Sequence, residues 1–335
     1  MNDKEKFRLG VIGAGIFAEA NHYPSLSTHF FDDVERVAVC DLQLERAERL
    51  AGKYGWKKTY TDFKAMLAKE SLNAVIVCLG GKYHPDVVPE VLERGLPVFL
   101  EKPSSIDVAG TLKILEASKK TGLPVQVGHQ KRHGLAYERA RAYIRDKEKF
   151  GNIIQIESKM HGFTVFPTFY TCMLEWQCHN LDLMISFGGQ ITEIEAKSFR
   201  NSDRTGALTA MLRFESGALG ILGWGTYGGP GQFAERIEVL GDKGRGVIVT
   251  NARVVTFYDE EVGETWTSDW NPISKNQSYM FNGYIPELRH FIDCVKEGRQ
   301  PVPSIEDEAK TMQYLAEIAT KAGIPIEWAP VSSAL

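Results

Sequence analysis

Apolar and polar positions along the first 128 residues follow a pattern that is typical of a parallel β-sheet covered by helices. Five short runs are almost continuously apolar, and amphipathic segments with helical spacing separate them. A strand covered by helices on both faces of its sheet is apolar on both sides, which explains the continuous runs. The pattern predicts a doubly wound sheet whose strands are FRLGVI, VERVAVC, NAVIVCL, PVFLE and PVQVG.

The pattern changes in the rest of the chain. It predicts a strand near 152–161, a helix across 173–187, and then closely spaced strands joined by short turns. Residues 215–217, Glu-Ser-Gly, link two of these strands as in a hairpin. Helices near 284–297 and 305–322 close the chain. This part is predicted to be an α+β domain with a large, mostly antiparallel open sheet.

The length of the chain favours two domains, because a single hydrophobic core stops growing at roughly 250–300 residues and the chain has 335. We place the boundary between residues 1–128 and residues 129–335. The net charge of -4 provides no basic field for nucleic acid or anionic lipid, so neither is expected as a partner. The N-terminal segment lacks the pattern of a secretory signal, and five scattered cysteines fit reduced thiols. We therefore expect a cytoplasmic protein.

A glycine-rich turn follows the first strand and opens the first helix. The segment VIGAGIFA supplies Gly13, Gly15 and Ala18 in the G-x-G-x-x-G/A pattern of a Rossmann dinucleotide site. Gly13 permits a tight turn, Gly15 lets the backbone approach a pyrophosphate, and Ala18 permits close packing of helix and strand. The structural alternative is an ordinary turn, which the surrounding strand–helix–strand context disfavours.

Asp41 ends the second apolar strand, 23 residues after Ala18. An acid there accepts hydrogen bonds from the adenosine ribose and repels a 2′-phosphate, so NAD is favoured over NADP as cofactor. The alternatives are that Asp41 only caps the next helix, and that Arg46 serves a 2′-phosphate. We expect the cofactor to contact Gly13, Gly15, Ile16, Phe17, Asp41, His84, Glu101 and Lys102.

Two groups of residues are candidates for the chemistry. Lys102, in Glu101-Lys102-Pro103, follows the fourth apolar strand, at the edge where open parallel sheets bind ligands. Glu175, His179 and Asp182 are spaced i, i+4 and i+7, so they share one face of a helix. Burying such polar groups without partners costs several kcal/mol, so we expect them to line a functional site. A metal site is an alternative for this helix, but no standard zinc spacing is present.

These residues and their order resemble the glucose-fructose oxidoreductase/inositol dehydrogenase (Gfo/Idh/MocA) family over nearly the whole chain. The resemblance lies in the nucleotide turn, His84, Glu101-Lys102-Pro103, Arg132, the helix with His179, and the late segment PELRHFIDCVKEGRQPVPSIEDE. It implies that Lys102 is the principal acid/base residue and that His179 orients the substrate or transfers a proton. It also assigns a catalytic place to Glu175.

The sequence departs from the family pattern around the presumed substrate. Glu175 stands where most relatives have Asp, Thr171-Cys172 where glycines are usual, and Gly81 where Pro is frequent. Arg132, Asp182 and Phe163, the last in the aromatic stretch HGFTVFPTFYT, are further candidates for substrate contact. A metal is not expected.

The function expected from these features is hydride transfer between NAD and a secondary alcohol carbon of a sugar, cyclitol or related polyol. The alternatives are a glycosidase that oxidises its sugar transiently with NAD, and a nucleotide-binding regulator of the same fold. We also expect a homodimer or homotetramer formed through the outer face of the second sheet. Apolar residues at alternate positions of two strands suggest this face: Leu208, Ala210 and Leu212, and Ala218, Gly220 and Leu222.

Overall fold

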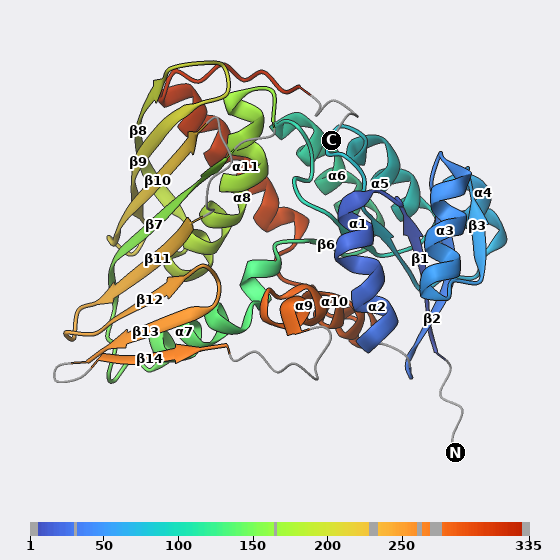
Figure 1. Ribbon diagram of the computed structural model, residues 1–335, viewed down its shortest axis with the longest axis horizontal. Coiled ribbons are helices and arrows are strands. Elements are labelled where there is room, and N and C mark those ends of the chain that lie inside the picture. The colour runs from blue at the N-terminus through green and yellow to red at the C-terminus, as the bar shows by residue number, and fades with distance from the viewer. Residues whose placement is uncertain are drawn as a thin grey trace. The chain divides into compact units, whose positions relative to one another are not determined.

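The computed structural model describes residues 6–29, 32–163, 166–227, 234–259, 263–268 and 277–329. It divides into two compact units. The first consists of residues 1–130 and 273–309, and the second of residues 131–272 and 310–335. Each unit contains one β-sheet, drawn as arrows in Figure 1.

The sheet of the first unit has six parallel strands in the order β3-β2-β1-β4-β5-β6. The order reverses between β1 and β4, which is the topological switch point where such sheets bind nucleotides. The predicted doubly wound sheet is thereby confirmed, with one short edge strand, β3, more than expected. The elements are β1 (Phe7–Ile12), α1 (Ile16–Ala20), α2 (His22–His29), β2 (Val34–Cys40), α3 (Leu44–Tyr54), β3 (Lys58–Tyr60), α4 (Phe63–Lys69), β4 (Ala74–Val77), α5 (His84–Glu93), β5 (Val98–Leu100), α6 (Val108–Thr121), β6 (Val125–Val127), α9 (Gln277–Phe281) and α10 (Tyr284–Glu297).

Separate hydrophobic cores lie on the two faces of this sheet. On β4, Ala74 and Ile76 belong to one core, and Val75 and Val77 belong to the other. Successive side chains of a strand point to opposite faces, so a strand covered on both sides is apolar throughout. This packing is why the first 128 residues contain continuous apolar runs.

The first unit includes a late segment of the chain, residues 273–309. Helix α10 places Ile285, Leu288, Phe291 and Ile292 in the core that also contains residues of β1 and α3. The predicted second domain, 129–335, includes this segment, whereas the structure assigns it to the first unit. The apolar stripe of α10 predicts a packed helix but does not show which sheet it covers.

The second unit is built on an eight-stranded sheet in the order β14-β13-β12-β11-β7-β10-β9-β8. Only β7 and β10 pair in parallel, so the predicted mostly antiparallel sheet is confirmed. The short helix η1 (Gln130–His133) crosses the division between the units, as does α11 (Ile305–Lys321). The other elements are α7 (Leu135–Arg145), β7 (Ile153–Phe163), α8 (Phe169–Gly188), β8 (Ile191–Arg200), β9 (Gly206–Phe214), β10 (Leu219–Tyr227), β11 (Ala234–Gly241), β12 (Gly246–Thr250), β13 (Val254–Tyr258) and β14 (Gly263–Thr267).

Helix α8 packs on β7 and β10 and covers the inner face of this sheet (Figure 1). The prediction that the apolar residues of these strands lie on the outer face is wrong, because they are buried on the side that α8 covers. A Cβ added at Gly220, for example, would approach Met184 of α8. Strand alternation shows that two faces differ, but not which face the helix covers. The residues concerned are Leu208, Ala210, Leu212, Ala218 and Leu222, all less than 5% exposed, and Gly220.

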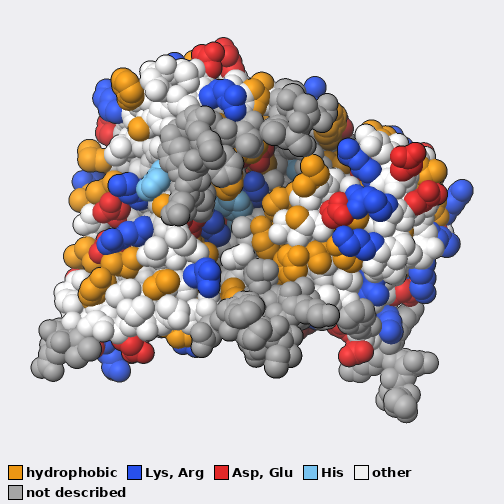
Figure 2. All heavy atoms as spheres, viewed as in Figure 1, with side chains coloured by type: hydrophobic (Ala, Val, Ile, Leu, Met, Phe, Trp, Pro, Cys, Tyr) orange, Lys and Arg blue, Asp and Glu red, His pale blue; other side chains and the backbone are white. Residues whose placement is uncertain are grey.

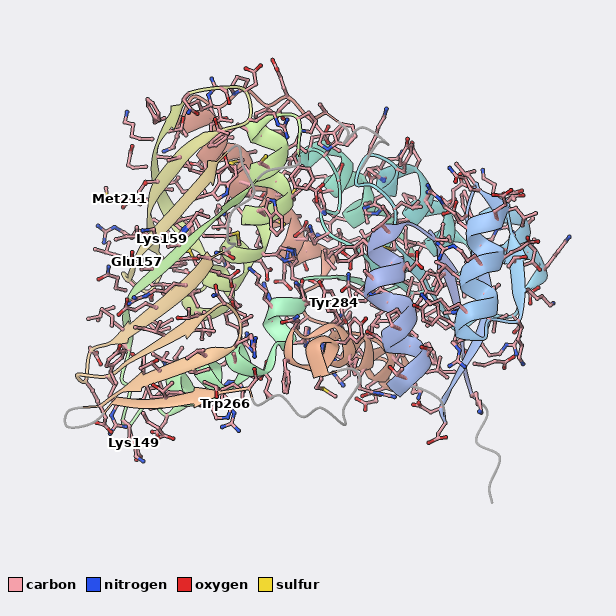
Figure 3. The ribbon with its side chains drawn as sticks, viewed as in Figure 1. Lys149, Glu157, Lys159, Met211, Trp266 and Tyr284 are labelled. Atoms are coloured by element: carbon pink, nitrogen blue, oxygen red, sulfur yellow. The ribbon has the colours of Figure 1, made fainter. Side chains whose placement is uncertain are left out.

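The outer face of the sheet carries the opposite set of alternate residues. Met211 is 63% exposed and Leu219 is 50% exposed, on the neighbouring strands β9 and β10. Figure 3 shows Met211, Glu157 and Lys159 on the side of the sheet away from α8. Charged side chains of both signs are interspersed over the face of the molecule seen in Figure 2.

Candidate active site

The turn after β1 requires glycine at its first position. Gly13 has a φ of 112°, and a Cβ there would lie 2.1 Å from the backbone oxygen of Cys78. The Gly13 N–H donates to the Cys40 carbonyl at 2.8 Å, and the Tyr23 hydroxyl donates to the Gly13 carbonyl at 3.0 Å. The turn is therefore held between β2, β4 and α2 in a conformation that an L side chain does not fit.

Gly15 has a different role, because no atom lies within 4 Å of the position where its Cβ would be. The next two residues open α1 with apolar side chains that are unusually exposed, Ile16 at 75% and Phe17 at 40%. An open backbone beside exposed apolar groups fits the predicted approach of a dinucleotide.

Asp41 lies directly after β2 and contacts the same turn. One carboxylate oxygen accepts the Ala14 N–H at 2.8 Å, and the other accepts the Gln43 N–H at 2.9 Å. Asp41 is only half-buried, so its oxygens keep lone pairs that can accept from a ribose hydroxyl. The acid thus orders the nucleotide turn in addition to the role that the sequence predicts.

The Glu101-Lys102-Pro103 segment leaves the carboxyl end of β5. The Glu101 carboxylate is buried; it accepts His22 Nε2–H at 2.6 Å through one oxygen and the Lys102 N–H at 3.0 Å through the other. Lys102 itself is half-buried. The backbone of Lys102 is therefore held by the side chain that precedes it.

His84, at the start of α5, supports this segment from below. Its Nδ1–H donates to the Pro103 carbonyl at 3.0 Å, and its Nε2 accepts the Leu79 N–H at 3.3 Å. Burial lowers the pKa of His84 to about 4, because the charged imidazolium is poorly solvated in a dry site. The neutral ring fits this donor and acceptor pair, so His84 links the turn after β4 to Lys102-Pro103.

In the second unit, α8 carries the predicted acid, histidine and acid on one face. Thr168 caps the helix by accepting the Thr171 N–H. His179 and Asp182 are buried, with 6% and 1% exposure, and Glu175 is half-buried. The i, i+4, i+7 spacing therefore falls on a continuous helix, as expected.

Arg132 of η1 forms a bidentate ion pair with Asp182. Its Nε and Nη2 groups donate to the two carboxylate oxygens at 2.7 and 2.6 Å. Both side chains are more than 90% buried, so each neutralises the other. Their predicted contact with substrate stays a prediction, and the pair itself fixes η1 to α8.

A second buried network in this unit contains Lys131, which no motif of the sequence indicates as a buried residue. Lys131 is 9% exposed; its Nζ donates to Asn180 Oδ1 at 2.8 Å and pairs with Glu235 of β11. The Tyr137 hydroxyl also donates to Glu235. No local pattern indicates that a lysine and a glutamate 104 positions apart meet.

The aromatic stretch predicted near the substrate includes the last residues of β7 and the first residues of α8. Phe169 and Tyr170 are core residues, and the Phe169 ring stacks on Trp224 at 4.5 Å between centroids. Phe163 ends β7, and its side chain lies outside the described part of the chain. The predicted residues are thus assembled as two sets: the nucleotide turn, Asp41, His84, Glu101 and Lys102 in the first unit, and Arg132, Glu175, His179 and Asp182 in the second.

Comparison of the sequence with known protein families shows which family these two sets of residues are typical of. Residues 7–129 match the model described as "Oxidoreductase family, NAD-binding Rossmann fold", and residues 137–247 match the "GFO/IDH/MocA C-terminal domain". The chain belongs to the Gfo/Idh/MocA oxidoreductase family. It is an oxidoreductase with an NAD-binding Rossmann domain, and the family resemblance predicted from the motifs is confirmed.

Curated relatives of this Gfo/Idh/MocA protein match along most of both chains. The 4-carboxy-2-hydroxymuconate-6-semialdehyde dehydrogenase of Sphingobium is 26% identical over 93% of this chain and 97% of the relative. The myo-inositol 2-dehydrogenase of Thermotoga maritima is 25% identical over 90% and 91%. These relatives act on different substrates, so membership of the family does not define the substrate.

Solved structures share the fold at lower identity. A dehydrogenase from Chromobacterium violaceum has a TM-score of 0.87 at 22% identity and covers 95% of this chain and 96% of its own. An Agrobacterium radiobacter oxidoreductase, solved with NAD+, L-tartaric acid and magnesium, has a TM-score of 0.82 at 15% identity, covering 98% and 100%. Among the described helices of this Gfo/Idh/MocA protein, none has the length and apolar character that crossing a bilayer requires.

Proposed function

We propose that the protein oxidises a secondary alcohol carbon of a polyol, cyclitol or sugar with NAD, and that Lys102 accepts the hydroxyl proton. The observation that carries the proposal is the placement of Lys102. It follows β5 at the carboxyl edge of the parallel sheet, the edge that also presents the nucleotide turn after β1. A lysine at this edge can meet the reacting end of a dinucleotide bound at the switch point.

The residues that would hold NAD are Gly13, Gly15 and Asp41, with Ile16 and Phe17 beside them. They fit the cofactor because the backbone at Gly15 is open and because the half-buried carboxylate of Asp41 can accept further hydrogen bonds. Bound NAD supplies the hydride acceptor, and the protein supplies orientation and proton transfer. Lys102 in its neutral form takes the proton as the carbinol carbon loses hydride.

His179 of α8 is proposed to bind a hydroxyl of the substrate, and Glu175, one turn earlier, to orient that histidine or bind a neighbouring hydroxyl. The Arg132–Asp182 pair supports this helix face by fixing η1 against it. A polyol substrate is favoured because a relative is a myo-inositol 2-dehydrogenase, and because a half-buried carboxylate and a buried imidazole are good partners for hydroxyl groups.

The test is a panel of polyols, cyclitols and sugars screened for NADH absorbance, repeated with variants of Lys102. Lys102→Ala should lose about 10²–10⁴ in turnover. Lys102→Arg keeps the positive charge but cannot act as a base, so it should lose turnover as well. Lys113→Ala is the matched control, because Lys113 is an exposed α6 residue that pairs with Asp86. Wild-type turnover in both Lys102 variants would refute the assignment.

Net NADH formation also separates the proposed dehydrogenase from its alternatives. A glycosidase that reduces its sugar again would release product without accumulating NADH, and a regulator would bind NAD without turnover. Either result would contradict net oxidation as the function.

We also propose that two copies associate through the outer face of the eight-stranded sheet. On this face, Glu157 lies opposite Glu238 and Lys159 lies opposite Arg236 in the β7–β11 register. Like charges directly opposite each other are unfavourable. Within one copy Arg236 pairs with Glu238 at 2.7 Å, and a two-fold partner can add charges of opposite sign against Glu157 and Lys159. The exposed apolar residues of β9 and β10 extend the same surface.

Light scattering at micromolar concentration tests this association. The wild type should have at least twice the single-chain mass of 37.5 kDa. Met211→Glu, which places a charge in the exposed apolar part, should shift the mass toward that of one chain. A single-chain mass for the wild type would refute the proposed interface.

A further inference from the structure

Three ionisable side chains meet inside the first unit, beneath the nucleotide turn and the Lys102 segment. They are His22 of α2, Glu101 after β5 and Glu287 of α10, with exposures of 0%, 3% and 0%. A nitrogen of His22 and one carboxylate oxygen of each glutamate all lie within 4.8 Å of one another. Elements from the beginning, middle and end of the chain therefore converge on one buried polar centre.

The hydrogen bonds within this centre are unequal. Both Glu101 oxygens accept hydrogen bonds, from His22 and from the Lys102 N–H. Among the described residues, neither side-chain oxygen of Glu287 has a hydrogen-bond partner, and neither has His22 Nδ1. The backbone of Glu287 is held, since its carbonyl accepts Gln126 Nε2–H at 3.0 Å. The side chain of Glu287 can therefore form further hydrogen bonds within this centre.

The charges around Glu287 disfavour its ionised form. Burial and the negative charge of Glu101 both raise the pKa of Glu287 well above its ordinary value. Burial and the negative charge of Glu101 also raise the pKa of Tyr284 of α10, whose ring contacts His22. Other titratable groups near Glu101 include Cys78, Lys102 and His84. Two ionised carboxylates this close in a dry interior would repel each other strongly.

We propose that Glu287 is carried as a neutral carboxylic acid whose proton bonds the His22–Glu101 pair, and that it thereby positions Lys102. Across a span within 4.8 Å, a carboxylic acid can donate to the Glu101 carboxylate after a small rotation or through one water. A Glu101 carboxylate held in this way keeps its second oxygen on the Lys102 N–H. This inference rests on the proposed role of Lys102 as proton acceptor.

The centre also contacts the nucleotide turn. The His22 ring packs edge-on against Phe17, with centroids 5.9 Å apart, and against Tyr284 at 6.2 Å. Phe17 is one of the expected cofactor contacts, and Lys102 is the expected base. By fixing His22, Glu287 would therefore affect both the cofactor contact at Phe17 and the proposed base Lys102, although it is part of neither.

Thermal unfolding as a function of pH tests the protonation of Glu287 without any substrate. A carboxyl whose folded pKa is raised stabilises the fold fully below its unfolded pKa, and this contribution is lost as pH rises toward the folded pKa. Each pH unit in that window costs about tenfold in the folding equilibrium constant. Glu287→Gln keeps the shape and a donor but cannot ionise, so its melting temperature should rise relative to wild type between pH 5 and pH 8.

Glu308→Gln is the matched control in the same unit. Glu308 is equally buried, but its oxygens accept from His129 at 2.7 Å and from the Ser104 N–H at 3.3 Å. An amide has only one acceptor oxygen, so this variant loses one of the two hydrogen bonds or forces His129 into its other tautomer, and it should melt several degrees lower at every pH. If Glu287→Gln behaved like Glu308→Gln, Glu287 would be an ionised acceptor and the proposal would be overturned.

Kinetics test the positioning role separately. Glu287→Met keeps the side-chain volume but removes the donor, so kcat should fall by up to about 100-fold while KM for the polyol stays near wild type. Glu287→Gln should restore most of kcat. A purely structural role would lower the melting temperature of Glu287→Met without changing kcat, and that outcome would overturn the positioning role.

The two proposals fail in distinguishable ways. If Lys102→Ala keeps its turnover, the proposed base is wrong, but the pH-dependent advantage of Glu287→Gln would still establish a neutral Glu287. If Lys102→Ala is inactive and Glu287→Gln shows no pH-dependent gain, the base stands and the neutral acid is wrong.

Discussion

The two glycines of the nucleotide turn make a matched pair of substitutions with opposite expected results. A Cβ at Gly13 would lie 2.1 Å from the Cys78 carbonyl oxygen and 2.8 Å from its carbonyl carbon, at a φ of 112°. Both obstacles are backbone atoms of the segment after β4, so they cannot move like a flexible side chain. A Cβ at Gly15 would meet no atom within 4 Å, and its φ of -75° suits any residue.

The magnitudes follow from these two geometries. A strained backbone conformation costs about 1–3 kcal/mol, and an overpacked position costs a similar amount. We therefore expect Gly13→Ala to lose about 2–6 kcal/mol of unfolding free energy. Gly15→Ala should change it by less than about 1 kcal/mol, because reduced freedom of the unfolded chain offsets a poorer helix cap.

NAD affinity, in contrast to stability, should be reduced by the substitution at Gly15. The added methyl of Gly15→Ala occupies the space through which the backbone approaches the pyrophosphate, so NAD affinity should fall at least about tenfold, or 1.4 kcal/mol. Urea unfolding and calorimetric titration with NAD measure the two quantities. Wild-type NAD affinity in a stable Gly15→Ala, or wild-type stability in Gly13→Ala, would refute this reading of the turn.

Three further predictions concern other residues of the two sets. Asp41→Ala should narrow the preference for NAD over NADP in calorimetric titrations, and tighter binding of NADP by the wild type would contradict the role of Asp41. Because burial lowers the pKa of His84 from 6.5 to about 4, its contribution to stability is present above pH 6.5 and should be lost as pH falls toward 4, by roughly 3 kcal/mol. A His84→Gln variant with the same acid dependence as wild type in urea unfolding would contradict this. Asp182→Asn leaves Arg132 buried without its carboxylate and should cost about 3–5 kcal/mol in urea unfolding; a loss below 1 kcal/mol would show that the pair is not buried in solution.

Features that depend on local sequence were predictable. The nucleotide turn is one, because its glycine spacing is a local motif and because the backbone conformation and close packing at Gly13 leave few alternatives to glycine. The α8 constellation is another, because helix periodicity alone places Glu175, His179 and Asp182 on one face. The bounds of α10 and α11 also agree with the expected ranges, since their apolar stripes are regular.

Features that depend on long-range packing were not predictable. The apolar stripe of α10 fits either sheet, and only the packing of Leu288 and Phe291 shows that it returns to the first. Alternation in β9 defines two faces, but the position of α8 decides that Leu208 lies inside and Met211 outside. Buried pairs such as Lys131 with Glu235 are also invisible to periodicity, because an isolated lysine normally indicates solvent.

The central claim is that hydride passes from a carbinol carbon of the substrate to NAD, and isotope transfer tests it most directly. The best polyol from the panel, deuterated at its carbinol carbons, is incubated with NAD and the enzyme, and the NADH formed is weighed by mass spectrometry. The proposed mechanism predicts NADH one mass unit heavier than unlabelled NADH, formed about 10²–10⁴ times more slowly by Lys102→Ala. NADH without deuterium, or consumption of the polyol without any NADH, would contradict the mechanism.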